Sequence, residues 1–177
     1  MAGLIICPCT MLSLDRAMNY EQFKTIISRI AQQVDLTSSG ALSTNDDFTF
    51  LASNADSYRD FALRLLNDDV PVRDKRVTVY LIQKLSFEHY LWSLRFLLAK
   101  AKIKQVDPAL FEDAIIPGFE WNTRLQENYR RPGVRALIID VKQAKVLPSR
   151  CDDYLNEILS GRGNKHVQEM RRDGEIP

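Results

Sequence analysis

Glycine and proline are scarce in this sequence, with seven of each in 177 residues. Because chains built from many tight turns between strands need both residues, their scarcity argues against an all-β fold. Cysteine is scarce too: the count is three, and Cys7 and Cys9 are one residue too close for a C-x-x-C pair. The only histidines, His89 and His166, stand far apart and add no zinc ligands to that pair. We therefore expect reduced thiols and a cytoplasmic protein.

Long hydrophobic runs are missing as well. No apolar stretch approaches the roughly 18 residues that a membrane span needs, and the apolar N-terminus lacks the basic residues of a secretory signal. With 45% hydrophobic and 27% charged residues, the composition is that of a soluble globular protein. We expect one helical domain over residues 1–160 and a polar C-terminal appendage over residues 161–177.

Helical periodicity begins early in the chain. Asn19 and Gln22 have the spacing of a capping box, and apolar residues then recur at helical spacing as far as Val34. Residues 35–47 are polar and rich in turn formers, which predicts a loop. A second helix is predicted over residues 56–66, because the proline at position 71 and the polar residues before it end the apolar pattern.

Residues 74–104 are the dominant feature, because they contain neither proline nor glycine and are apolar nearly all round in their second half. This pattern predicts a compact domain around a long buried central helix that includes Trp92, with a break near Ser86 as the alternative. Further helices are predicted over residues 108–116, 119–130 and 149–159, and a last polar turn or short helix over residues 165–173.

The run from Ala136 to Ile139 leads directly into Asp140-Val141-Lys142 and is the best strand candidate in the sequence. A strand needs a partner, for which residues 4–9 or 48–51 are the candidates; without one, residues 136–141 are expected to end a helix. The predicted fold class is therefore mainly α, with one to three short strands near the C-terminal third.

Charge alternates along the chain beneath a net value of +1. Residues 73–106 hold eight basic and two acidic side chains, residues 107–123 hold four acids and no base, and residues 124–150 hold seven bases and two acids. The basic blocks suit either a phosphate-binding face or pairing with the acidic blocks. The sequence pI of 7.7 lies below the value of about 9 that is typical of nucleic-acid-binding domains.

The acid-x-lysine pattern of Asp140 and Lys142 has a second interpretation, a metal-dependent nuclease. On a strand these two side chains project from the same face, where the acid would hold Mg²⁺ or Mn²⁺ and the lysine would orient water. Asp113 or Glu120 would have to supply a further carboxylate, but neither has a strand-like context. The plain end of a strand is the favoured interpretation.

No catalytic motif is found, so we expect a non-enzymatic adaptor that binds another protein and needs no cofactor; the alternatives are a nucleic-acid-binding protein and the nuclease. Eight Phe, six Tyr and two Trp are many aromatics for one domain to bury, and Trp, Tyr and Arg commonly anchor interfaces. The candidate binding residues are Trp121, Arg124, Tyr129, Arg130, Arg131 and Arg135.

Overall fold

A computed structural model describes residues 18–36, 40–116 and 123–174. These residues form ten α-helices and one short 3-10 helix, and none of them lies in a strand. The predicted mainly helical class is confirmed. The helices are α1 (Tyr20–Gln33), α2 (Asp46–Ser53), α3 (Ala55–Asn67), α4 (Val72–Ile82), α5 (Phe87–Lys102), α6 (Pro108–Ile115), α7 (Thr123–Glu127), α8 (Pro132–Ala144), α9 (Asp152–Ser160) and α10 (Arg162–Arg172), with the 3-10 turn at Ser149–Cys151.

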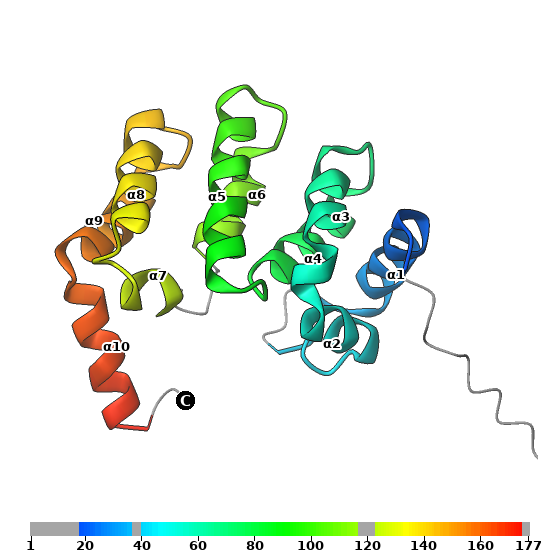
Figure 1. Cartoon of the computed structure of the whole chain (residues 1–177), viewed down its shortest axis with the longest axis horizontal. Helices are drawn as coiled ribbons and strands as arrows, with labels where there is room; N and C mark the ends of the chain where they lie inside the picture. The colour runs from blue at the N-terminus through cyan, green and yellow to red at the C-terminus, as the bar shows by residue number, and fades with distance from the viewer. Residues whose placement is uncertain (1–17, 37–39, 117–122, 175–177) are drawn as a thin grey trace, which may run out of the picture.

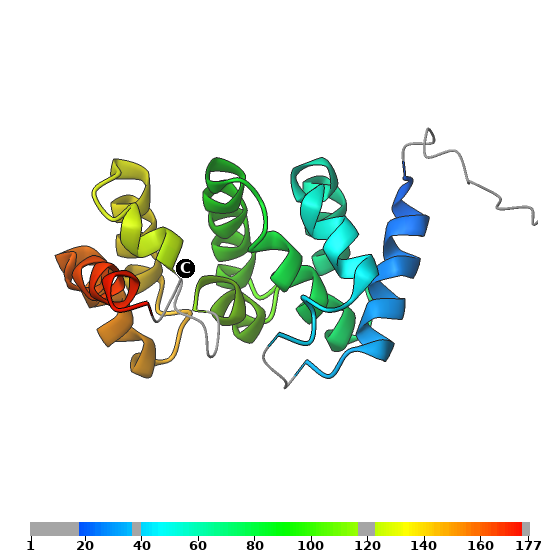
Figure 2. The same ribbon diagram turned by 90° about the horizontal axis from the view of Figure 1, so that it is seen from below.

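The helices stack side by side as an elongated array of hairpins (Figure 1). Helix α3 packs against α4, α5 against α6 and α8 against α9, so that each hairpin contributes one helix to each of two layers. Helices α3, α5 and α8 make one layer, while α4, α6 and α9 make the other (Figure 2). Helix α1 lies against α4 at one end, and α10 packs on α7 and α9 at the other. The core is therefore a band between the layers.

Local signals explain several helix starts. Asn19 and Gln22 form the predicted capping box, in which each side chain accepts from the other residue's backbone N–H. Asp107 caps α6, and Pro108 follows at the first position. Residues 48–51, one of the candidate partner strands, instead belong to helix α2, which Asn45 caps. The other candidate partner, residues 4–9, lies outside the described residues.

The central helix predicted over residues 74–104 is divided into α4 and α5 by the turn at residues 83–86. Two contacts from distant elements hold this break. The backbone N–H of Ser86 donates to Asp56 of α3 at 2.8 Å, and the guanidinium of Arg124 donates to the carbonyls of Gln83 and Leu85, both at 2.7 Å. The backbone groups that an unbroken helix would pair internally are satisfied by side chains.

Trp92 corrects a second expectation, because it is not buried. Its exposed fraction is 48%, whereas Tyr90, Leu94 and Leu97 of the same helix are at most 1% exposed. Helix α5 thus has one face in the core and one face in solvent. The prediction of a central helix buried along residues 74–104 was wrong, since an apolar residue type does not establish that a neighbour covers it.

Residues 136–141 are not the favoured strand but lie inside α8, as expected in the absence of a partner strand. The buried residues of α8 follow helical spacing, and Pro132 occupies the first turn, where its missing N–H costs nothing. Ile139 is 42% exposed, so the apolar run is not buried throughout, as a core strand would be. The buried residues are Val134, Leu137, Ile138 and Val141.

Within the described ranges, no helix combines the length and the apolarity that crossing a bilayer requires.

Candidate binding surface

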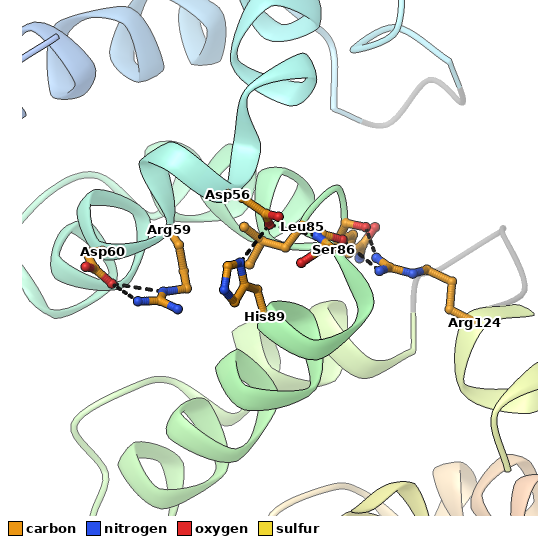
Figure 3. Close-up of polar contacts among 8 residues, drawn as sticks. Asp56, Arg59, Asp60, Leu85, Ser86, His89 and Arg124 are labelled. Carbon is orange, nitrogen blue, oxygen red and sulfur yellow. Dashed lines mark hydrogen bonds and ion pairs between the residues drawn. The ribbon is translucent and has the colours of Figure 1, made fainter. Parts of the chain in front are cut away.

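Arg124, one of the predicted binding residues, supports the fold. Its two hydrogen bonds to the turn between α4 and α5 are accompanied by stacking over the Tyr90 ring, with the guanidinium carbon 4.8 Å from the ring centroid. Burial lowers the pKa of Arg124 below its usual range. Its donors are therefore engaged with carbonyls of the chain itself (Figure 3).

The remaining basic residues of this block also make local contacts. Arg130 donates to the hydroxyl of Tyr129 at 2.8 Å, and Arg135 donates to the carbonyl of Leu159 at 3.1 Å. Arg131 forms an ion pair with Glu88 at 2.7 Å. Arg130 thus contacts Tyr129, another of the predicted residues. Arg124 and Arg131 both lie over the Phe87 ring, with guanidinium carbons 5.9 and 4.8 Å from its centroid, whereas Arg135 contacts α9 instead. Trp121 lies outside the described residues.

The acidic residues considered for a metal site are not brought together. Asp113 of α6 faces Arg76 at 3.7 Å, and its burial raises its pKa. Asp140 is exposed on α8, and Lys142 donates to Asn156 at 2.5 Å. Side chains two residues apart on a helix are rotated by about 200° around its axis and so project from nearly opposite sides. Alternate residues of a strand, in contrast, project from the same face. Glu120 lies outside the described residues, among which no cluster of three or more His, Cys, Asp or Glu side chains occurs.

A different surface, absent from the sequence-based prediction, lies on the solvent side of α5. The rings of Trp92 and Phe96 stack with centroids 5.9 Å apart and planes at 19°. A cation lies over each ring: Arg59 of α3 is 5.0 Å from the Trp92 centroid, and Lys100 is 5.5 Å from that of Phe96. The rings thus form a firm, partly exposed platform with a positive charge at each end.

The platform continues along the helix. Ala99 is exposed, and Ile103, at the C-terminal cap of α5, is 61% exposed. Trp92, Phe96, Ala99 and Ile103 are separated by four, three and four residues, which places them on one stripe of the helix. We call these four residues the α5 seam. Single exposed apolar residues are common on proteins, but a stripe of them along one helix marks a surface suited to binding.

The start of α5 is held to α3 by polar contacts (Figure 3). Asp56 accepts the backbone N–H of Ser86, and its Oδ1 lies 3.0 Å from Nδ1 of His89. Beside it, Arg59 is held by the neighbouring Asp60 at 2.9 Å. These contacts fix the position of Arg59 over the Trp92 ring, at one end of the platform.

Asp56 is expected to make this junction sensitive to acid. Partial burial acts to raise its pKa, but the hydrogen bonds from Ser86 and the proximity of His89 outweigh that effect, so the pKa lies below its usual range. A lowered carboxyl pKa stabilises the fold above the unfolded-state value of about 4 and ceases to do so as the pH falls through the folded-state value.

We predict that Asp56→Ala lowers the free energy of unfolding by about 1 kcal/mol near pH 6, through loss of the Ser86 hydrogen bond. The difference from wild type should shrink as the pH falls from about 4 through the lower pKa of the native carboxyl, which takes up its proton only there. Denaturant titrations at several pH values measure it, with Asp60→Ala as the control on the same helix. A difference that stayed constant to acid pH would contradict this assignment.

Sequence reasoning missed the α5 seam because the whole apolar run around Trp92 was assigned to a buried helix. The available signal was the spacing of Trp92, Phe96, Ala99 and Ile103, which repeats at helical period on a stripe distinct from Leu94, Leu97 and Leu98. Compared with models of protein families, with curated proteins and with solved structures, the chain gives no match. The functional argument therefore rests on the chain itself.

Proposed function

We propose that this protein is a non-enzymatic adaptor, a helical array that binds another protein through the α5 seam. The observation that carries the proposal is the platform of Trp92 and Phe96, which is stacked, partly exposed and held between Arg59 and Lys100. Trp and Arg are the residue types most often found at the centres of binding hot spots. A pre-stacked pair also loses little side-chain freedom when a partner covers it.

The position of the α5 seam supports the same conclusion. Helix α5 lies in the middle of its layer, between α3 and α8, where a partner can contact three helices (Figure 2). Its other face is anchored in the core by residues such as Leu94 and Leu97, each 0% exposed. Exposed binding side chains on a rigid buried scaffold keep their geometry in the absence of the partner.

The test is a comparison of two double variants in affinity capture from a lysate of the source organism. Trp92→Ala with Ile103→Ala removes the two most exposed apolar side chains of the α5 seam. The control, Phe50→Ala with Val72→Ala, removes an aromatic and an aliphatic side chain of similar exposure, 40% and 60%, from α2 and α4. Both variants should stay folded, with losses of about 1–2 kcal/mol for each partly buried aromatic.

We predict that proteins captured by the wild type and by the control variant are lost, at least about tenfold, from the Trp92→Ala/Ile103→Ala variant. Quantitative mass spectrometry of the eluates measures this. The control for folding is the circular dichroism melting curve of each variant. Equal capture by all three proteins would contradict the proposed role of the α5 seam.

A further inference from the structure

The α5 seam has the spacing of a heptad repeat. Intervals of four, three and four residues are those that separate successive a and d positions in helices that pair with one another. With Trp92 as a d position, Phe96 becomes a, Ala99 becomes d and Ile103 becomes a. The side chains of an incoming helix would pack between those of the α5 seam, which makes a helix the natural occupant of the stripe.

The residues beside the α5 seam are basic. Of the four e and g positions between Trp92 and Ile103, Ser93 is buried and the other three are Arg95, Lys100 and Lys102. These are the positions that select a partner by charge. Residues 89–106 contain no Asp or Glu at all. Any acid that neutralises these three cations must therefore come from elsewhere.

The rest of the described chain does not supply such an acid. Arg95 donates to the backbone carbonyl of Gly133 at 3.1 Å, and Lys100 donates to the side-chain amide of Gln105 at 2.8 Å. Lys102 is exposed, and within the described ranges none of the three makes an ion pair. The flanks of the α5 seam thus keep their positive charge.

Charge also decides between the candidate occupants. Two copies of this chain joined by their α5 seams would bring cations against cations, which disfavours self-association. A nucleic acid would neutralise the cations and could stack a base on the exposed Trp92 ring, but Ala99 and Ile103, the second half of the stripe, offer no ring to the bases that follow. A helix with apolar a and d residues and with Asp or Glu at e and g satisfies both the stripe and its flanks.

We infer that the α5 seam binds an acidic amphipathic helix of another protein. This inference rests on the proposed function and adds the chemistry of the partner to it. Apolar contacts with Trp92, Phe96 and Ile103 would supply most of the affinity, while Arg95, Lys100 and Lys102 would select acidic partners and speed their association.

The experiment selects binders from a displayed library of helical peptides about three heptads long, with Leu fixed at a and d and with Glu, Lys or Gln allowed at each e and g position. The wild-type protein should enrich Glu at e and g, and the Arg95→Glu/Lys100→Glu/Lys102→Glu variant should enrich Lys instead. Arg130→Glu/Arg135→Glu/Lys145→Glu changes the net charge equally on another surface and should enrich Glu as the wild type does. In fluorescence anisotropy, an enriched peptide with Glu at e and g should bind the wild type at least about tenfold more tightly than the same peptide with Lys at those positions.

Each outcome bears on a different claim. No enrichment, or the same preference in wild type and reversed variant, overturns the acidic partner. Binding that persists in Trp92→Ala/Ile103→Ala overturns the proposed function as well, whereas binding that needs Trp92 but ignores charge overturns only the inference. A labelled oligothymidylate that binds more tightly than every peptide, and is lost in the reversed variant, would assign the surface to nucleic acid.

Discussion

Phe111→Ala is expected to lower the free energy of unfolding by about 3–5 kcal/mol, the range for removing a fully buried aromatic side chain. Phe111 lies on α6 and is 0% exposed, in the core between the two helical layers. Helix α6 packs against α4 and α5, whose side chains are held in place and can close the resulting cavity only in part. Equilibrium unfolding in guanidinium chloride measures the loss.

Trp92→Ala is the matched comparison, because it removes a larger side chain from the neighbouring helix. With 48% of the residue exposed, the expected loss is only about 1–2 kcal/mol. The ratio of the two losses reports which aromatic belongs to the core. Equal losses, or a larger one at Trp92, would contradict the division of α5 into a core face and an exposed face.

Gly161→Ala is the second substitution with a large expected effect, about 3 kcal/mol, from two causes that add. Gly161 joins α9 to α10 with a φ of +73°, a conformation that strains any residue with a Cβ atom. A Cβ atom there would also lie 2.5 Å from Cε2 of the Tyr129 ring. Helix α10 packs on α7 and α9, so the substitution should loosen this end of the array.

Gly174→Ala separates the two causes. Its φ is +75°, almost the same, but a Cβ atom there meets nothing within 4 Å. It should therefore show the strain alone, about 1 kcal/mol or less at the frayed end of a helix. Adding Tyr129→Ala to each glycine variant completes the cycle, and it should relieve part of the Gly161→Ala loss while leaving Gly174→Ala unaffected. Relief at neither position would contradict the contact with Tyr129.

Helix boundaries set by neighbouring residues could be predicted from the sequence. Asn19 with Gln22, and Asp107 with Pro108, fix helix starts through hydrogen bonds that span three residues or fewer. The break at residues 83–86 was predicted only as an alternative, because the side chains that stabilise it belong to residues distant in the sequence. Arg124 reaches carbonyls 41 and 39 residues before it, and nothing in the local sequence indicates that contact.

For the proposed binding site, the sequence indicated the types of residue, aromatic and basic, but not their positions. The choice of Arg124 and its neighbours was based on charge density along the chain. Which side of α5 is covered depends on the placement of α3, α6 and α8, and periodicity alone does not determine that placement. The same applies to residues 136–141, where a contiguous apolar run suits both a strand and a helix.

The most direct test of the account places a photo-crosslinking amino acid, p-benzoylphenylalanine, at position 99 in the middle of the α5 seam. Ala99 is exposed, so the substitution leaves the core unchanged. Irradiation of the protein with its bound partner, or with a selected acidic peptide, should give a covalent adduct. The same amino acid at position 50, where Phe50 is 40% exposed on α2, should give none. An adduct from position 50 and none from position 99, with binding retained by both proteins, would contradict the assignment of the α5 seam as the binding surface.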